Sequence, residues 1–474
     1  MKRYETLASD IAASIQNGVL KPGDRLPSVR QASKSRNVSP ATVFEAYYRL
    51  EGRGLIRSRP RSGYYVAAQA QALLPEPNRP SMPDGEARRV EINELFFEIV
   101  DSVMAHDVVP LGSAFPSPVL FPLDKLGRAM ASSALRLDPW STVDDLTPGN
   151  IGLRRQIALR YLIDGPQIAA DDIVITNGAL EALNLCLSAV CSPGDAVIVE
   201  SPCFYACLQA LESRNLHAIE VATDPRDGID LDALEIAIRR HRPKACWVMT
   251  NFQNPLGGTM GEDKKRALVE LVTRHRLPLI EDDVYSELYF GEHRPVSTKA
   301  YDREGWVMHC SSFSKTLAPG YRIGWVAAGR FRQAVARQKL VNTLATCIPA
   351  QIAIARYLER GNYDRYLRRL RKTLMESRDQ YIAAISRYFP ENARVSRPAG
   401  GYFVWVELPE GSDALAVQRQ AMAAGISIAP GPMFSATRAF AHCLRINYGH
   451  PLSEKAEAAL KTLGDICHRM VRAR

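Results

Sequence analysis

The first 66 residues have the spacing of short amphipathic helices followed by a hairpin. Apolar residues recur at three- and four-residue intervals in the first segment, namely at Tyr4, Leu7, Ile11 and Ile15. Ser28 is a candidate N-cap for a second helix, and Ser39-Pro40 supplies an N-cap and a first-turn proline for a third. The apolar pairs at 55–56 and 64–66 flank a basic tip and predict two short strands.

From about residue 93 the pattern changes to short apolar runs separated by helical stretches. The runs lie at 173–175, 196–199, 218–221, 246–249, 279–280, 306–308 and 323–326. Continuous apolar runs suit strands that are buried on both faces, so the sequence predicts an α/β domain around a mainly parallel sheet. Further runs at 401–406 and 443–447 predict strands of a smaller α+β lobe at the C-terminal end.

The segment between these two regions is rich in proline and poor in periodicity. Residues 67–92 contain Pro75, Pro77, Pro80 and Pro83, which favours an extended and mobile tether. The alternative is a loop that packs onto the body. The sequence therefore predicts three parts: a head at 1–66, a linker at 67–92 and a body at 93–474.

Charge is distributed unevenly between these parts. Lys plus Arg number 60 and Asp plus Glu 51, which gives +9 for the chain. Twelve basic and five acidic residues lie in 1–66, so +7 of the +9 belongs to the head. A basic head on a nearly neutral body predicts contact with a polyanion.

Other composition features exclude several classes of protein. The nine cysteines are scattered without metal-ligand spacing, so we expect reduced core thiols and no metal site. No apolar run approaches the roughly 20 residues of a membrane span, and the N-terminus lacks a signal-peptide core. We therefore expect a cytoplasmic protein with no membrane partner.

The second and third helices of the head have the order of a helix-turn-helix. A helix fits the major groove of DNA, and its first residues reach the base edges. The alternative is a basic, solvated surface on a small helical domain. The predicted DNA-binding residues are Arg30, Ser39, Pro40, Ala41 and Thr42, with Arg59 and Arg61 at the hairpin tip.

Three motifs of the body suit an aldehyde cofactor. Lys315 in Ser312-Phe313-Ser314-Lys315 follows a strand, where an amine can form a Schiff base, and Arg322 with the two serines suits a phosphate. Asp282 follows another strand, where a buried carboxylate can keep a pyridine nitrogen protonated. Tyr285 and the amide of Asn254 can contact a ring oxygen. Taken singly, the three motifs can also be interpreted as an ordinary surface lysine, a solvated acidic turn and a plain turn.

Three weaker signals fit the same chemistry. The backbone amides of Ala179 and Leu180 open a predicted helix, and free amides at a helix N-terminus bind phosphate. Phe204 can stack on a flat ring, although a core aromatic is the simpler interpretation. The guanidinium of Arg445 can bind a substrate carboxylate through two hydrogen bonds, or it can form a structural ion pair.

Both parts of the chain resemble known families. The segments Gly23–Arg30, Val38–Val43, Gly54–Ile56 and Ser62–Val66 closely resemble the GntR winged-helix family, which implies a dimer that reads two half-sites. The order and spacing of Gly178, Phe204, Asn254, Asp282, Tyr285, Lys315, Arg322 and Arg445 resemble the fold type I aminotransferases over residues 93–474, with a small lobe at roughly 345–474.

The resemblance implies a pyridoxal 5′-phosphate site. By position, Lys315 carries the Schiff base, Asp282 pairs with the pyridine nitrogen and Phe204 stacks on the ring. Asn254 and Tyr285 hold the phenolic oxygen, and Arg445 takes an α-carboxylate. The phosphate is held by Ser312, Ser314, Arg322 and the amides of Ala179 and Leu180.

A GntR head on an aminotransferase body resembles the MocR subfamily of transcription regulators, and the region from Pro148 to Ala158 resembles its YdcR-like branch. Two positions depart from the aminotransferase pattern. Asp144 stands where a tyrosine often reaches the partner subunit's cofactor phosphate, and Ala179 stands where many relatives have serine. Both departures are expected to weaken the grip on the cofactor.

The sequence thus predicts a DNA-binding transcription regulator whose body binds pyridoxal phosphate and senses that cofactor or an amino acid or amine. The expected partners are double-stranded DNA, the small-molecule effector and a second copy in a homodimer. The alternative is a functional aminotransferase, acting on an amino acid and a 2-oxo acid, with an appended DNA-binding domain. A cofactor-storing protein with an inert head is a third hypothesis.

Overall fold

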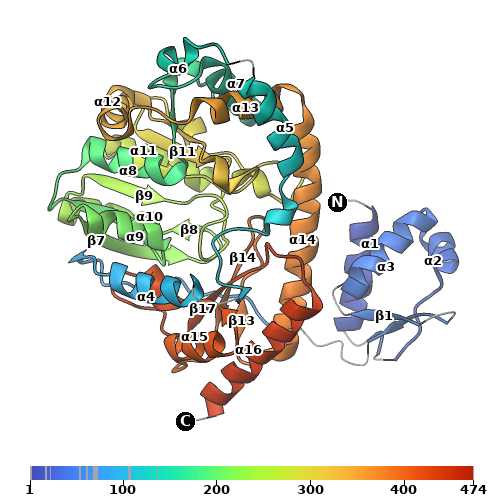
Figure 1. Ribbon diagram of the computed structural model, residues 1–474. Helices are drawn as coiled ribbons and strands as arrows, with labels where there is room; N and C mark the ends of the chain where they lie inside the picture. Colours follow the sequence, from blue (N-terminus) through green and yellow to red (C-terminus); the bar gives the residue numbers. More distant parts are fainter. Residues whose placement is uncertain are drawn as a thin grey trace.

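The computed structural model of the chain consists of a small head and a larger body (Figure 1). The structure describes residues 3–16, 19–21, 23–52, 55–59, 62–67, 73–104, 108–135 and 137–472. Within these ranges, no helix has both the length and the hydropathy needed to cross a bilayer.

The head is a three-helix unit with a two-stranded wing. Its elements are α1 (Arg3–Gln16), α2 (Val29–Arg36), α3 (Pro40–Gly52), β1 (Ile56–Arg59) and β2 (Gly63–Val66). The predicted cap at Ser28 is confirmed, because its side chain accepts from the Gln31 amide and the Gln31 side chain accepts from the Ser28 amide. The strands pair antiparallel. The face of α3 that holds the head together is fully buried, namely Val43, Ala46, Tyr47 and Leu50.

A nine-stranded sheet forms the centre of the body. Its strands run in the order β3-β7-β6-β9-β10-β11-β12-β5, with β8 paired to β7. The bounds are β3 (Ala87–Arg89), β5 (Ile173–Thr176), β6 (Ala196–Ser201), β7 (His217–Asp224), β8 (Gly228–Ile229), β9 (Ala245–Val248), β10 (Leu279–Asp282), β11 (Val307–Ser312) and β12 (Gly324–Ala327). The five strands from β7 to β11 along this order are parallel, whereas β12 is antiparallel to both its neighbours. The predicted mainly parallel sheet is therefore confirmed.

Helices cover both faces of this sheet (Figure 1). The helices of the body are α4 (Asn93–Met104), α5 (Leu123–Ala134), α6 (Ser141–Asp144), α7 (Ile151–Asp164), α8 (Ala179–Val190), α9 (Tyr205–Ser213), α10 (Leu231–His241), α11 (Glu262–Arg274), α12 (Arg332–Thr343), α13 (Ile348–Glu359), α14 (Asn362–Tyr388), α15 (Ala414–Ala423) and α16 (Glu454–Arg472). Successive residues of β6 enter different cores. Val199 packs in the core that includes α8 and α9, and Ile198 packs in the core that includes α10 and α11.

Short 3-10 turns connect several elements: η1 (Pro118–Leu120), η2 (Ala170–Asp172), η3 (Ser286–Leu288), η4 (Thr298–Tyr301), η5 (Pro319–Tyr321), η6 (Gly329–Phe331) and η7 (Gly431–Phe434). Two of them follow strands that carry predicted site residues. The turn η3 begins four residues after the end of β10, and η5 lies between β11 and β12.

The small lobe contains the antiparallel sheet β13 (Arg394–Val395), β14 (Phe403–Glu407), β17 (Cys443–Asn447) and β16 (Ala429–Pro430). A separate pair joins β15 (Ile426–Ser427) to β4 (Val109–Pro110) in parallel. The expected boundary at 345 needs correction, because α13 packs against α5 and α7 at the other end of the body. The long helix α14 then leads into the small lobe, which also recruits the early strand β4.

The expectation of a mobile tether over 67–92 is wrong for residues 73–92. Leu74 is buried, its amide donates to Ser386 Oγ on α14 at 3.0 Å, and the amide of Val395 donates to the Pro75 carbonyl. Further along, the Ser81 amide donates to the Thr223 carbonyl, and β3 adds an antiparallel edge strand beside β7. The segment is therefore a strap that contacts first the small lobe and then the large sheet.

Replacing Leu74→Asp is expected to release this strap, because a carboxylate would replace a buried apolar side chain. Trypsin cleavage after Arg88 and Arg89 should become at least about tenfold faster, since proteolysis follows the population of the open form. Met82→Asp is the matched control, because Met82 is 95% exposed in the same strap. Equal cleavage rates in wild type and Leu74→Asp, followed by mass spectrometry, would contradict the packing.

Candidate functional site

Two neighbouring parallel strands bring Asp282 and Lys315 into one site. Asp282 is the last residue of β10 and pairs in register with Cys310 of β11, and Lys315 follows β11 by three residues. The carboxyl ends of parallel strands meet at one edge of a sheet, where open α/β folds bind their ligands. Asp282 is buried and Lys315 is half-buried.

Burial shifts both groups towards their neutral forms. Burial raises the pKa of Asp282 to about 7, and the charge of Asp283 adds to this shift while Lys315 and His309 oppose it. Burial likewise lowers the pKa of Lys315 to about 7, helped by Arg445 and Arg322 and opposed by Asp282. The amine of Lys315 is therefore a nucleophile near neutral pH, which an ordinary lysine is not.

A hydrogen-bonded chain links the predicted ring and carboxylate contacts. Asn254 Nδ2 donates to Tyr285 Oη at 3.4 Å, and Arg445 Nη1 donates to Asn254 Oδ1 at 3.1 Å. All three side chains are buried. Burial raises the pKa of Tyr285 above its usual range, against the opposing charge of Arg445, so its hydroxyl stays protonated at neutral pH.

The predicted phosphate contacts gather at the N-terminus of α8. Arg322 Nη1 donates to Ser314 Oγ at 3.3 Å, and its Nη2 donates to the Asn177 carbonyl at 3.0 Å. Gly178 caps α8 with φ of 82°, and a Cβ there would clash with the Arg322 guanidinium. Ser312 Oγ accepts from the Ser314 amide, and α8 starts with Ala179 and Leu180.

The residues present fit pyridoxal phosphate. Asp282 Oδ1 is buried and has no hydrogen-bond partner in the described structure, which is the arrangement that a protonated ring nitrogen would complete. The phosphate contacts lie at a helix N-terminus, where unpaired amides and the helix dipole favour an anion. Phe204 caps α9 at the end of the loop after β6 and is only partly buried, so its predicted stacking role stays a prediction.

Sequence reasoning missed the segment Gly112–Pro116, which follows β4 and covers the site. Lys315 Nζ donates to the Ala114 carbonyl at 2.8 Å, and it lies 3.8 Å from the ring centre of Phe115. Arg445 Nη2 donates to the Gly112 carbonyl at 2.7 Å. The backbone oxygens in these contacts are about 200 residues or more away in sequence from Lys315 and Arg445. No local sequence motif therefore predicts the contacts.

The two departures from the aminotransferase pattern lie in different surroundings. Asp144 ends α6 and is exposed, whereas Asp145 accepts from the side chain of Asn150, the N-cap of α7. Ala179 is buried at the first position of α8, so its methyl group replaces a hydroxyl at the phosphate end. The predicted weaker grip on the cofactor stays a prediction.

The structure places most predicted DNA contacts on the surface of the head. Arg30, Pro40 and Ala41 are exposed, while Ser39 Oγ accepts from the Thr42 amide and so caps α3. Arg59 is exposed and lies over the ring of Tyr65, and Arg61 lies outside the described residues.

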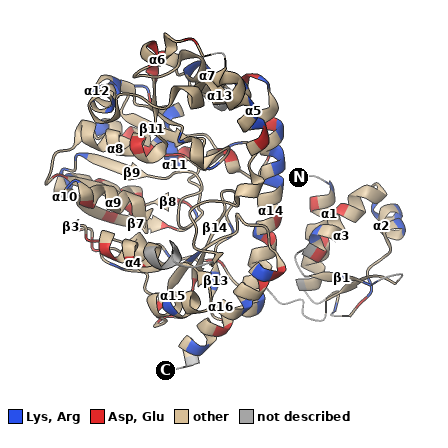
Figure 2. Ribbon diagram, viewed as in Figure 1, with Lys and Arg blue, Asp and Glu red and all other residues tan. Residues whose placement is uncertain are grey.

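The first turn of α3 faces the body. Ala41 and Thr42 line a 970 Å³ cavity together with Arg371 and Lys372 of α14. Figure 2 shows Lys and Arg positions, coloured blue, at several places along α14.

Comparison with known proteins agrees with both halves of this description. Residues 3–66 match the bacterial regulatory proteins of the gntR family, and residues 147–463 match aminotransferase class I and II. The chain is 47% identical, over 98% of its length and 99% of the other, to an uncharacterized HTH-type transcriptional regulator, YdcR, of Escherichia coli (strain K12). It is 39% identical to another regulator of the same organism, YjiR, over 99% of each chain.

Solved structures resemble the body. The crystal structure of LysN, an alpha-aminoadipate aminotransferase from Thermus thermophilus complexed with N-(5′-phosphopyridoxyl)-L-leucine, matches with a TM-score of 0.74 at 28% identity. The match covers 81% of this chain and 97% of that chain. A multiple substrate aminotransferase from Thermococcus profundus matches with the same TM-score and identity, over 81% and 96%.

Fold and site together define a helix-turn-helix transcriptional regulator with a fold type I aminotransferase body. The chain belongs to the MocR type of the GntR regulators, since both family matches and the full-length relatives agree.

The lowered pKa of Lys315 gives a testable pH dependence. An amine with a pKa of about 7 gains about tenfold in its neutral fraction between pH 6 and pH 8 and then levels off. The side-chain amine of an ordinary lysine, with a pKa of about 10.4, gains about a hundredfold without levelling off. Borohydride trapping of pyridoxal phosphate at Lys315, counted by peptide mass spectrometry, should follow the first profile. A hundredfold rise would contradict the burial effect.

Proposed function

We propose that this regulator binds pyridoxal 5′-phosphate as a Schiff base on Lys315 and senses the cofactor or an amino acid or amine that reacts with it. The observation that carries this proposal is the unpaired, buried Oδ1 of Asp282 beside a lysine whose pKa burial has lowered to about 7. Because a buried carboxylate oxygen without a partner is costly, the site is built for a cationic ligand group.

Each part of the cofactor has a matching group. Asp282 pairs with the ring nitrogen, and Tyr285 with Asn254 holds the phenolic oxygen. Ser312, Ser314, Arg322 and the first amides of α8 hold the phosphate. When bound, the cofactor supplies an electron sink. The protein orients its ring and excludes water, and Lys315 supplies the amine and moves the proton at Nζ.

Arg445 sets the class of effector. Its guanidinium is buried and lies 4.2 Å from the ring centre of Phe403. Nη2 donates to the Gly112 carbonyl, and Nη1 donates to Asn254 Oδ1. A buried guanidinium needs acceptors, and an α-carboxylate supplies two of them in a planar arrangement. An amino acid therefore fits both ends of the site, with its amine at Lys315 and its carboxylate at Arg445.

A homodimer is supported by an apolar surface next to the phosphate end. Val341 and Leu344 near the end of α12, and Trp140 before α6, are exposed, Val341 by 84% and Trp140 by 70%. Two hydrogen bonds fix the end of α12 beside α8, because Thr147 donates to the Leu344 carbonyl and Thr343 donates to Glu181 of α8. Large exposed apolar side chains favour a protein partner, and a second copy of this chain is the partner proposed here.

The strap supports coupling between body and head. Residues 73–92 contact the small lobe and the large sheet, so a movement between these two parts moves the point where the head is attached. In this arrangement Ala41 and Thr42 face α14 across the 970 Å³ cavity, which is far too small for a duplex. DNA contact at these two residues therefore needs the head to separate from α14.

The second candidate is a working aminotransferase with a DNA-binding head. It is favoured by one observation: Lys315, Asp282 and Arg445, the three groups that transamination needs, are all present in one site. Release of a 2-oxo acid over many turnovers, with regeneration of the cofactor, would favour the enzyme. Ligand-dependent DNA affinity without turnover favours the sensor.

Lys315→Ala tests the cofactor assignment. The purified wild type should show the visible absorbance of a pyridoxal Schiff base and change it on addition of amino acids, whereas the variant should lose that absorbance. Binding of the variant to DNA should stay within about twofold of cofactor-free wild type, because Lys315 belongs to the body and is not one of the predicted DNA contacts. An unchanged absorbance spectrum in the variant would refute the assignment.

Arg59→Ala tests the wing of the head. Arg59 is exposed on β1, and we assign it to a phosphate contact that carries no sequence information. Binding should weaken for all sequences, and the slope of log K against log salt should fall by about 0.9. Arg303→Ala, an exposed arginine of the body, is the charge-matched control. A slope equal to that of wild type would exclude the contact.

A further inference from the structure

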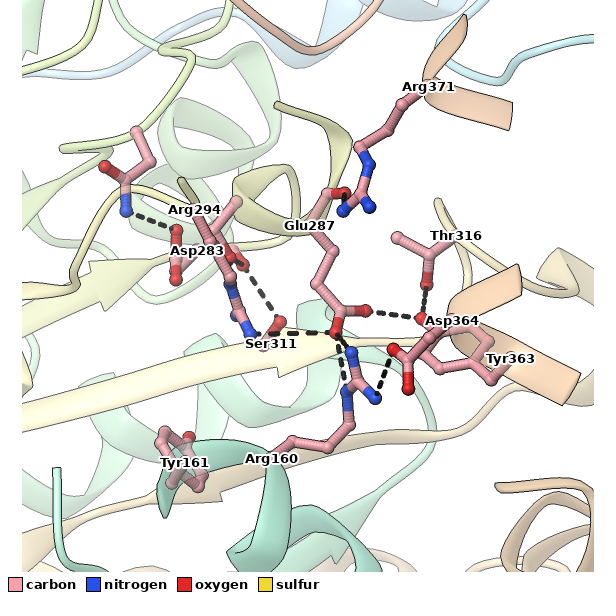
Figure 3. Close-up of polar contacts among 12 residues, drawn as sticks. Arg160, Tyr161, Asp283, Glu287, Arg294, Ser311, Thr316, Tyr363, Asp364 and Arg371 are labelled. Atoms are coloured by element: carbon pink, nitrogen blue, oxygen red, sulfur yellow. Dashed lines mark hydrogen bonds and ion pairs between the residues drawn. The ribbon is translucent and has the colours of Figure 1, made fainter. Parts of the chain in front are cut away.

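The residues that directly follow Asp282 and Lys315 both belong to a buried polar cluster behind the site (Figure 3). These residues are Asp283 and Thr316, each at most 2% exposed. Figure 3 shows Arg294 lying between Asp283 and Glu287, the two buried carboxylates of the cluster. Such buried charges are costly unless each is paired, so their retention needs a reason.

Asp283 is fixed on every side. Its Oδ1 accepts from Asn251 Nδ2 at 2.9 Å, and its Oδ2 accepts from His309 Nε2 at 3.0 Å. Its backbone carbonyl accepts from Ser311 Oγ at 2.9 Å, and its amide donates to the Cys310 carbonyl. The hydrogen bonds to His309 and Asn251, together with Arg294, lower the pKa of Asp283 despite its burial, so it stays ionised.

A chain of hydrogen bonds leads from Trp325 through Tyr161 to His309. Trp325 Nε1 can only donate, and it does so to Tyr161 Oη at 2.9 Å. Tyr161 Oη lies 2.6 Å from His309 Nδ1 and has one proton to give. When Tyr161 donates to Nδ1 of the neutral imidazole, the ring proton is on Nε2, which lies 3.0 Å from Asp283 Oδ2. In this arrangement each member of the relay Trp325–Tyr161–His309–Asp283 donates a hydrogen bond to the next, and Asp283 accepts the last one.

We propose that Asp283, held by this relay, is a positioning residue that keeps the ring nitrogen of the cofactor protonated through Asp282. This inference rests on the proposed function. The relay fixes the backbone of β10 at its end, so the Asp282 carboxylate faces the site rather than the core. The second negative charge raises the proton affinity of the pair formed by Asp282 and the ring nitrogen. The charge of Asp283 also raises the pKa of Asp282, which is an effect in the same direction.

The other arm of the cluster provides a control. Tyr363 Oη bonds to the Glu287 carboxylate and lies 2.8 Å from Thr316 Oγ1, next to Lys315. Arg160 and Arg294 pair with the same carboxylate. The hydroxyl of Tyr363 positions the turn that carries Lys315 and contacts neither Asp282 nor Asp283 among the described hydrogen bonds. A change there should leave the ring nitrogen unaffected.

The test measures the protonation of the ring directly. Wild type, Asp283→Asn and Tyr161→Phe are loaded with pyridoxal phosphate labelled with ¹⁵N in the ring, and the ¹⁵N shift is followed against pH. Asp283→Asn should lower the apparent pKa of the ring nitrogen by about one unit, a tenfold change in proton affinity. Tyr161→Phe breaks the relay but keeps the charge, so it should give a smaller shift of the same sign. Tyr363→Phe is the matched control and should titrate as wild type does.

The outcomes separate this inference from the proposed function. If wild type binds the cofactor but Asp283→Asn titrates as wild type does, the inference fails and the proposed function stands. An equal shift in Tyr363→Phe would show a general loosening and would also overturn it. If Asp283→Asn does not fold, Tyr161→Phe decides, and an unchanged titration in that variant refutes the relay. A wild-type chain that takes up no pyridoxal phosphate overturns both.

Discussion

Asp282 and Lys315 are opposite charges placed together where water is largely excluded, and the body is organised around that placement. Burial drives the pKa of each group to about 7, and each opposes the shift of the other. A buried charge without a partner costs several kcal/mol, so the surrounding groups must either pair it or leave room for a ligand that does. Most neighbours are paired among themselves, whereas Asp282 Oδ1 is left without a partner in the described structure. That imbalance is the physical basis for a cationic ring nitrogen at this position.

The same site connects distant parts of the chain. The segment Gly112–Pro116 follows β4, which pairs with β15 of the small lobe, and its carbonyls accept from both Lys315 and Arg445. The strap at 73–92 runs from the small lobe to the edge of the large sheet and leads to the head. Ligand chemistry at Lys315 is therefore mechanically close to the joint between the two parts of the body, and that joint carries the attachment of the DNA-binding domain.

Local patterns predicted much of this structure because each reports the burial of one element. The spacing of Val43, Ala46, Tyr47 and Leu50 predicted the buried face of α3, and all four are fully buried. The apolar run at 279–280 located β10 and placed Asp282 at its end. The strap was misjudged for a related reason. All three residues of β3 are exposed, and the strand is held by backbone hydrogen bonds to β7, so it shows no apolar alternation.

The sequence by itself determined the two-part architecture, the strands and helices of the core, and the residue types that give the site its chemistry. These follow from periodicity, capping and short motifs, which act over a few residues. Only the tertiary structure decided which backbone oxygens face Lys315 and Arg445, how Trp325, Tyr161 and His309 line up behind Asp283, and where the strap packs. Those contacts join residues far apart in sequence. They depend on backbone geometry and on the direction in which each hydrogen bond is donated, and the identity of neighbouring residues specifies neither.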